Sequence, residues 1–126
     1  TVARASAVPV PNLPDRSHGV AGMIRALTDR TRVVIVCTPN SPTGTLVTEA
    51  DLERLLAAVP RDLLVLLDEA YGEFFGPEHA LDGMRLLVDH PNLVVLLSFS
   101  KAYVLPCLPI SYAVGHPRIL DSSRSA

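Results

Sequence analysis

Four side chains that could do chemistry together follow two short apolar runs. Asp68 and Tyr71 come after residues 63–67, and Ser98 and Lys101 come after residues 93–97. A carboxylate at the end of an apolar run is partly buried, so it needs a cation or hydrogen-bond donors as partners. A desolvated lysine has a lowered pKa and can form a Schiff base with a carbonyl group. Asp68 and Lys101 therefore point to a ligand with a cationic group and a carbonyl.

Each of these residues also has an ordinary structural explanation when it is considered alone. Asp68 can cap the turn after its strand, and Lys101 can be a solvent-exposed lysine. Tyr71 can pack its ring on the rim of a sheet, and Ser98 can bond a nearby backbone group. Residues 39–44, with two prolines and a glycine, have the composition of a turn. Only their joint placement favours a functional site.

The elements that must position these residues follow from the apolar pattern. Three runs lack apolar–polar alternation, which is typical of parallel strands covered on both faces. Between them apolar residues recur at helical spacing, and Thr48 with Asp51 forms a shortened capping box. The pattern predicts an α/β fold with three layers, α/β/α, around a mostly parallel sheet. The expected strands are residues 33–36, 63–67 and 93–97, with weaker ones at 7–10 and 110–114, and the expected helices are 20–27, 48–59 and 79–89.

Polar segments follow all three of the stronger strands, at residues 37–44, 68–71 and 98–101. The carboxyl ends of parallel strands meet at one edge of the sheet, where ligands bind in open α/β folds. We therefore expect these segments to form one site.

The composition excludes several classes of protein. The chain has 126 residues, 48% hydrophobic and 19% charged, which is typical of one packed domain. Its net charge of -2 provides no positive field for nucleic acid or an anionic membrane. Apolar runs are too short to span a bilayer and no secretory signal is present, so we expect a cytoplasmic location.

Cysteines and histidines give no sign of a metal site. Cys37 and Cys107 are far apart and outside any C-x-x-C pattern, which leaves one long-range disulfide as an open alternative. No metal-ligand spacing relates the four histidines, which are His18, His79, His90 and His116.

Three motifs together resemble the signatures of class I/II pyridoxal-phosphate aminotransferases of fold type I, with histidinol-phosphate aminotransferases as the nearest branch. They are Thr38-Pro-Asn-Ser-Pro-Thr-Gly44, Asp68-Glu-Ala-Tyr71 and Ser98-Phe-Ser-Lys-Ala-Tyr103, and the likeness extends over residues 28–119. The resemblance implies pyridoxal 5'-phosphate as cofactor. It also implies transfer of an amino group between an amino acid, or histidinol phosphate, and a 2-oxo acid such as 2-oxoglutarate, in amino-acid biosynthesis, including that of histidine.

The resemblance also implies a role for each candidate residue. Lys101 is expected to form an aldimine with the cofactor and to carry the proton between substrate Cα and cofactor C4′. Asp68 is expected to pair with the pyridine nitrogen, Tyr71 to donate to the phenolic oxygen, and Ser98 to bind the phosphate. Ser41 stands where the family usually has an asparagine that contacts the same ring oxygen, which makes Ser41 a further cofactor-binding candidate.

Departures from the family pattern bear on how much of the enzyme this chain represents. Pro109 stands where the family has a phosphate-binding arginine, and proline offers neither charge nor donor. An upstream phosphate loop and a downstream small domain have no match. Residues 1–126 are therefore expected to be part of the cofactor-binding large domain, inactive in isolation, and the full-length form is expected to be a homodimer.

Three alternatives stay open at the level of sequence. The same fold supports lyases and decarboxylases that use the same cofactor. Ser41 and Pro109 also fit a degenerate relative without catalysis. A phosphoacceptor receiver domain with Asp68 as acceptor is the third, although the first strand end lacks the acidic pair that would hold Mg²⁺.

Overall fold

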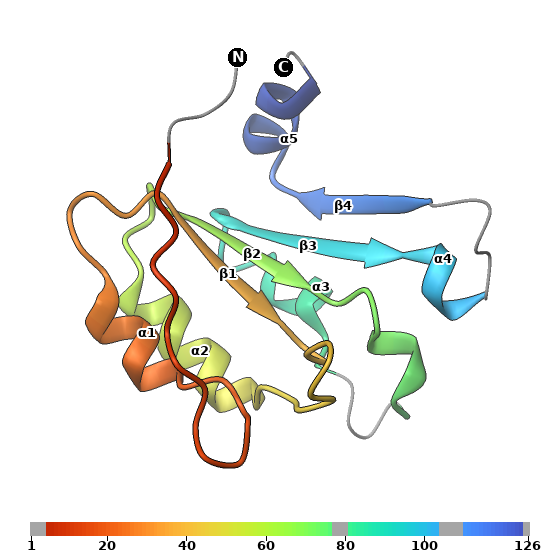
Figure 1. The fold of residues 1–126 in the computed structure, drawn as a ribbon. Coiled ribbons are helices and arrows are strands. Elements are labelled where there is room, and N and C mark those ends of the chain that lie inside the picture. Colours follow the sequence, from red (N-terminus) through yellow and green to blue (C-terminus); the bar gives the residue numbers. More distant parts are fainter. Residues whose placement is uncertain (1–4, 77–80, 104–109, 125–126) are drawn as a thin grey trace.

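A four-stranded sheet organises the chain in the computed structural model, which describes residues 5–76, 81–103 and 110–124 (Figure 1). The strands lie in the order β1-β2-β3-β4. The first three are parallel, and β4 is antiparallel to β3. This arrangement confirms the predicted α/β class with a mostly parallel sheet. The strands are β1 (Val33–Cys37), β2 (Leu64–Asp68), β3 (Leu93–Ser98) and β4 (Ser111–Gly115).

The helices begin and end close to the predicted positions in the first half of the chain. Thr48 caps α2 as expected: its Oγ1 accepts from the Asp51 N–H at 3.1 Å and donates to Asp51 Oδ2 at 3.1 Å. This exchange is the shortened capping box, and it fixes the first residue of the helix. The helical elements are α1 (Val20–Ala26), α2 (Glu49–Ala58), the 3-10 helix η1 (Gly72–Phe74), α3 (Gly83–Leu86), α4 (Phe99–Ala102) and α5 (Pro117–Arg124).

Two predicted elements differ from the structure. Residues 7–10 do not form a strand; Pro9 and the neighbouring Pro11 lack the N–H that a strand would donate, and Val8 is 72% exposed. The helix expected over residues 79–89 is shorter than predicted, because only α3 is helical among its described residues 81–89. Residues 79 and 80 lie outside the described residues. Helix α3 begins after Asp82, whose Oδ1 accepts a hydrogen bond from the Arg85 N–H. After the helix, the N–H groups of Asp89 and His90 both donate to Leu86 O.

The core lies on one face of the sheet. Alternate strand residues form two rows in register, Val34–Val65–Leu93 and Val36–Leu67–Val95, and all of them are buried. Helices α1, α2 and α3 supply the apolar side chains that cover these rows. Helix α3 packs closely against the sheet at Gly83, because a Cβ on this residue would lie 2.7 Å from Leu67 Cδ2 and 3.0 Å from Val95 Cγ2. The first residue of α3 is thus required to be small.

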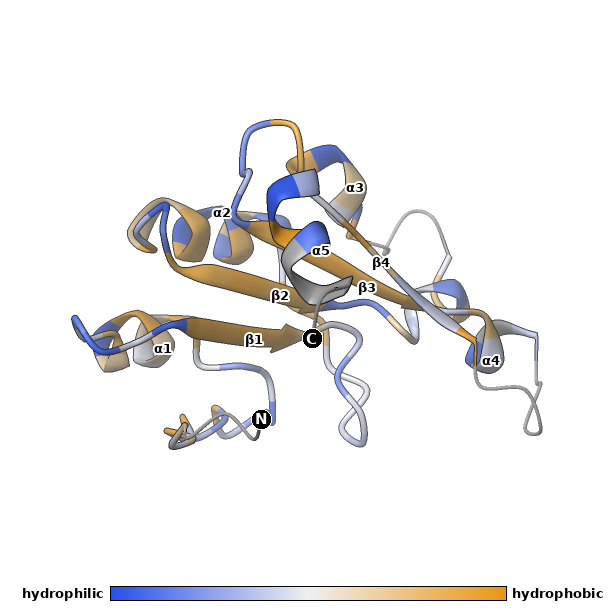
Figure 2. Cartoon of the chain, turned by 90° about the horizontal axis from the view of Figure 1, so that it is seen from above, coloured by the Kyte–Doolittle hydropathy of each residue, from blue (hydrophilic) through white to orange (hydrophobic). Residues whose placement is uncertain are grey.

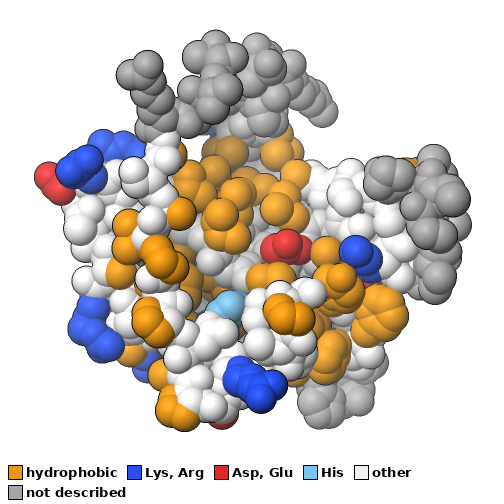
Figure 3. All heavy atoms as spheres, viewed as in Figure 1, with side chains coloured by type: hydrophobic (Ala, Val, Ile, Leu, Met, Phe, Trp, Pro, Cys, Tyr) orange, Lys and Arg blue, Asp and Glu red, His pale blue; other side chains and the backbone are white. Residues whose placement is uncertain are grey.

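The opposite face of the sheet is apolar but partly open. Val33 and Ile35 of β1 are 44% and 64% exposed. Figure 2 shows that β1, β2 and β3 are hydrophobic along most of their length, and Figure 3 shows apolar side chains gathered over the sheet in the view of Figure 1. The run of apolar residues without alternation led us to expect cover on both faces, and the described residues provide it on one. We refer to the second surface as the open face.

No helix within the described ranges has the length and apolar character needed to cross a membrane.

Candidate functional site

A cavity at the carboxyl ends of β2 and β3 brings together three of the predicted site residues. It has a volume of about 410 Å³ and is bordered by Asp68, Ser98 and Lys101. Asp68 and Ser98 are the last residues of their strands, and Lys101 lies in α4, which starts directly after β3. These three side chains thus border one cavity at the strand ends, whereas no residue of the expected segment 37–44 is part of its described lining. The complete described lining is Asp68, Ala70, Leu96, Leu97, Ser98, Lys101, Ser111, Tyr112 and Ala113.

Asp68 is held in place by the strand and by the turn that follows it. Its Oδ1 accepts a hydrogen bond from the Ala70 N–H at 3.0 Å, and its backbone oxygen accepts from the Thr38 N–H at 2.9 Å. The turn thus fixes one carboxylate oxygen while the side chain borders the cavity. The cap expected of a strand-end aspartate and a role in binding are both compatible with this geometry.

Tyr71 adjoins the cavity through Lys101. The Lys101 Nζ lies 5.4 Å from the centre of the Tyr71 ring, a distance at which the ring face attracts an ammonium group. Tyr71 precedes η1 and packs against Phe74, with ring centres 6.0 Å apart. The tight turn after β2 therefore places the Tyr71 ring beside the Lys101 amine, although the two residues are 30 positions apart in the sequence.

Ser98 faces β4 rather than a backbone group of its own turn. Ser98 and Ser111 are partners in the antiparallel register, and Ser111 Oγ donates to Ser98 Oγ at 3.2 Å. Beside them the rings of Phe99 and Tyr112 are stacked with centres 4.9 Å apart. Sequence reasoning missed Ser111 and Tyr112 as lining residues, because nothing in the sequence specifies the register of β4 against β3.

Ser41 is exposed, and it is not part of the described lining of the cavity. The loop around it is organised by its neighbours. Asn40 Nδ2 donates to Thr43 Oγ1 at 2.6 Å, and the Gly44 N–H donates to Asn40 O at 2.7 Å. Gly44 has a φ of 70°, which glycine adopts without strain. Asn40, Thr43 and Gly44 therefore stabilise the conformation of the loop. Pro109, the other departure from the family pattern, lies outside the described residues.

Cys37 stands beside Asp68 in the register of β1 and β2 and carries a free thiol. Burial raises the pKa of the Cys37 thiol; the Ser41 N–H opposes this, and the negative charge of Asp68 adds to it. The thiol therefore stays protonated at neutral pH. Cys107, the other half of the possible disulfide, lies outside the described residues.

Glu69 points away from the cavity into the core-side layer, where it is 8% exposed. Its Oε1 accepts from the Gly83 N–H at 3.1 Å. Burial raises the pKa of Glu69 to about 7; the Gly83 N–H acts in the opposite direction, and Asp82 raises it further. The two adjacent carboxylates thus lie in different surroundings: Asp68 borders the cavity, and Glu69 packs against the start of α3.

Glu69 should make folding less favourable as pH rises. Its pKa is higher in the folded chain than its ordinary value of 4.5. Between pH 4.5 and about pH 7 the Glu69 carboxyl is therefore protonated in the folded chain and ionised in the unfolded chain. Protonation of Glu69 stabilises the folded state by a free energy on the order of 3 kcal/mol, which is fully present below pH 4.5 and is lost as the pH rises through about 7. We expect Glu69→Gln to gain stability relative to wild type between pH 5 and pH 8, roughly the range of this titration. Urea denaturation at both pH values measures the difference, and exposed Glu73→Gln is the control. A Glu69→Gln difference that does not change with pH contradicts the expectation.

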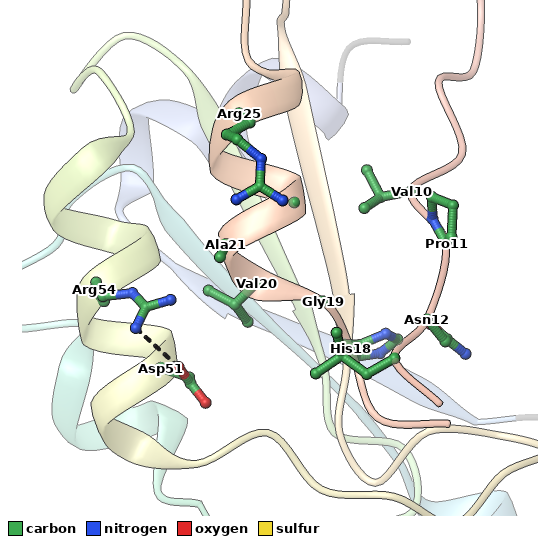
Figure 4. Close-up of a pocket in the computed structure, with 12 residues that line it drawn as sticks. Val10, Pro11, Asn12, His18, Gly19, Val20, Ala21, Arg25, Asp51 and Arg54 are labelled. Carbon is green, nitrogen blue, oxygen red and sulfur yellow. Dashed lines mark ion pairs between the residues drawn. The ribbon is translucent and has the colours of Figure 1, made fainter. Parts of the chain in front are cut away.

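A second cavity, of about 400 Å³, lies between the N-terminal segment and helices α1 and α2 (Figure 4). Arg25 and Arg54 reach it from the two helices, and Arg54 is paired with Asp51 at 3.7 Å. His18 links this region to the sheet, because its Nε2 lies 2.9 Å from Cys37 O. None of the predicted site residues borders this cavity. In the part of the chain that the structure describes, no cluster of histidine, cysteine, aspartate or glutamate is arranged to hold a metal ion.

Relatives of known sequence resemble the chain over nearly its full length. The aromatic amino acid aminotransferase of Cutibacterium acnes is 48% identical over 123 residues, which are 98% of this chain and 35% of that protein. The protein of the same name from Rhodococcus jostii is 50% identical over 121 residues, 96% of this chain and 33% of that protein. The chain thus spans about a third of the length of the curated relatives it matches.

Solved structures give the same result for the fold. Histidinol-phosphate aminotransferase from Sinorhizobium meliloti, in complex with pyridoxal-5'-phosphate, superposes with a TM-score of 0.83 at 30% identity, over 94% of this chain and 32% of that one. Aspartate aminotransferase from Thermus thermophilus gives 0.80 at 26% identity, over 94% and 31%. The family model described as "Aminotransferase class I and II" matches residues 1–126. By sequence and by fold, this chain belongs to the class I and II aminotransferase family.

Proposed function

We propose that the protein binds pyridoxal 5'-phosphate at the strand-end cavity and transfers amino groups between an amino acid and a 2-oxo acid. The observation that carries this proposal is that Asp68, Ser98 and Lys101 border one cavity in a member of this family, with Tyr71 against the lysine. Their chemistry fits the cofactor, which has a ring nitrogen to pair with a carboxylate, a carbonyl to react with an amine and a phosphate to accept from a hydroxyl.

Each residue is proposed to act on a different part of the cofactor or substrate. When bound, pyridoxal phosphate supplies an electron-withdrawing ring that stabilises negative charge at the substrate Cα. Lys101 would hold the cofactor covalently until the substrate amine displaces it, and the freed Lys101 amine would then carry the proton from the substrate Cα to cofactor C4′. Asp68 keeps a proton on the ring nitrogen, which maintains the electron demand of the ring. Tyr71 donates to the ring oxygen, and Ser98 binds the phosphate. Ser41, exposed in its loop, is the candidate with the least support.

Two substrate classes follow from the names of the relatives. The sequence relatives at 48% and 50% identity are aromatic amino acid aminotransferases, and the solved structure at 30% is a histidinol-phosphate aminotransferase. Because sequence identity is higher in the first group, we favour an aromatic amino acid as the amino donor and a 2-oxo acid such as 2-oxoglutarate as acceptor. Histidinol phosphate is the second candidate donor.

A reaction other than transamination has a specific observation in its favour. L-threonine-O-3-phosphate decarboxylase from Porphyromonas gingivalis shares the fold, with a TM-score of 0.66 at 29% identity. Fold alone does not distinguish the two reactions. The receiver-domain alternative, by contrast, is removed by the family match over the whole chain.

We further propose that residues 1–126 form part of a large cofactor-binding domain. Relatives are about three times as long, and the open face of the sheet offers apolar surface for further polypeptide. A full-length homodimer is the proposed assembly, by analogy with the family.

A direct assay tests the proposed function. The protein, expressed from its complete natural reading frame and supplied with pyridoxal phosphate, is incubated with 2-oxoglutarate and with phenylalanine, tyrosine or histidinol phosphate. We expect glutamate to form faster with the aromatic amino acids than with histidinol phosphate. Faster reaction with histidinol phosphate reverses the choice of donor. Release of carbon dioxide without glutamate overturns the proposed transamination.

A further inference from the structure

The strand-end cavity holds little positive charge for a phosphate group. Among its described lining residues, Lys101 is the only cationic one, and Asp68 is anionic. The proposed function assigns the Lys101 amine to the carbonyl of the cofactor. The neutral side-chain donors that the described lining offers to a phosphate are the hydroxyls of Ser98, Ser111 and Tyr112, and the two serines are paired with each other.

Ser111 is held opposite Ser98 by contacts that need no ligand. The two residues are register partners at the end of the β3–β4 ladder. The Phe99 N–H donates to Ile110 O at 3.0 Å, and the Ile110 N–H donates to Ser100 Oγ at 2.7 Å. These bonds tie the start of β4 to the start of α4, so the fold sets the backbone position of Ser111 opposite Ser98.

The direction of the serine–serine hydrogen bond determines what Ser98 can still do. Ser111 Oγ donates and Ser98 Oγ accepts, at 3.2 Å. A hydroxyl has one proton to donate and two lone pairs that accept. With one lone pair occupied, the proton of Ser98 remains available, and hydrogen bonds in a chain polarise one another, which strengthens the outer donor. The pair is thus a short relay that ends in a donor at the cavity wall.

We propose that Ser111 is a positioning residue for the phosphate group of the cofactor and that it acts through Ser98. Ser111 directs the Ser98 proton toward a phosphate oxygen and does not itself bind the phosphate. This inference rests on the proposed function, because it takes pyridoxal phosphate as the ligand of the cavity.

Comparison of pyridoxal phosphate with pyridoxal, which lacks the phosphate, tests the inference by binding alone. Both ligands are titrated into the protein from its complete reading frame, and the visible absorbance of the bound form gives each dissociation constant. We expect Ser111→Ala to weaken binding of pyridoxal phosphate about 3- to 10-fold and to leave pyridoxal binding unchanged. Ser111→Thr, which retains a hydroxyl, should restore most of the affinity for pyridoxal phosphate.

A double-mutant cycle with Ser98→Ala separates a relay from a direct contact. If Ser111 acts through Ser98, the double variant binds pyridoxal phosphate as weakly as Ser98→Ala alone. Ser100→Ala, which loosens the tie to Ile110, is the control and should affect both ligands equally. Additive losses in the cycle, equal losses for both ligands in Ser111→Ala, or no loss at all overturn the inference while leaving the proposed function intact. Failure of the wild-type protein to bind either ligand overturns both.

Discussion

Replacing Lys101 by arginine is expected to abolish the covalent attachment of pyridoxal phosphate and to lower the rate of amino transfer by roughly 10³-fold or more. Arginine keeps a positive charge beside the Tyr71 ring but has no amine that reacts with a carbonyl at neutral pH. The loss is therefore attributable to the chemistry of the amine and not to the charge. The measurement is borohydride reduction of the protein–cofactor mixture followed by peptide mass spectrometry.

The composition of the chain makes this experiment unambiguous within residues 1–126. Lys101 is the only lysine in the sequence. A reduced cofactor found on any side chain of this segment must therefore lie on Lys101, and Lys101→Arg should leave the segment unlabelled. Labelling of the segment that persists in the variant, or amino transfer at an unchanged rate, contradicts the role proposed for this residue.

The second large effect is expected for Asp68→Asn. The amide has the same shape and its oxygen can still accept from the Ala70 N–H, so the turn after β2 should be preserved. It cannot hold a proton on a ring nitrogen as a carboxylate does. We expect the cofactor to remain attached to Lys101 while amino transfer falls by about 10²- to 10³-fold. Visible absorbance measures the first quantity, and glutamate formation measures the second.

A neighbouring carboxylate provides the matched control for this variant. Asp62 is exposed in the loop before β2. Asp62→Asn changes net charge by the same amount and should leave amino transfer at the wild-type rate. Equal activity of the Asp68→Asn and wild-type enzymes would remove Asp68 from the chemistry, whereas loss of the attached cofactor in Asp68→Asn would assign it to binding instead.

Apolar runs were sufficient to predict the three parallel strands, because four or five consecutive Val, Ile and Leu residues between turn signals fit few other elements. The predicted ends of these three strands agree with the structure to within one residue. Because the strands are parallel, the polar residues that follow them lie at one edge of the sheet. The placement of Asp68, Ser98 and Lys101 at one cavity was therefore predictable.

Other features of the structure depend on contacts between residues that are distant in the sequence, and local sequence patterns do not predict such contacts. The pairing of Ser98 with Ser111 is set by the register of β4, which the intervening sequence does not specify. The short α3 depends on the bond from Gly83 to the buried Glu69, a contact between residues 14 positions apart. At residues 7–10 the apolar pattern suggested a strand, but the prolines there removed the donors it needed.

The order of the strands has a consequence for how the polypeptide acquires its shape during translation. Each of β2, β3 and β4 lies next to the strand made immediately before it. A newly emerged strand therefore finds its partner already outside the ribosome, and the sheet can be extended one strand at a time from the amino-terminal side. Nearest-neighbour pairing keeps the sequence separation of strand partners smaller than in a sheet whose adjacent strands are not consecutive, although each parallel pairing still has to close a loop that contains a helix before it forms. Ser98 and Lys101 would reach the carboxylate of Asp68 only when β3, the third strand, is added, and Ser111 would follow with β4.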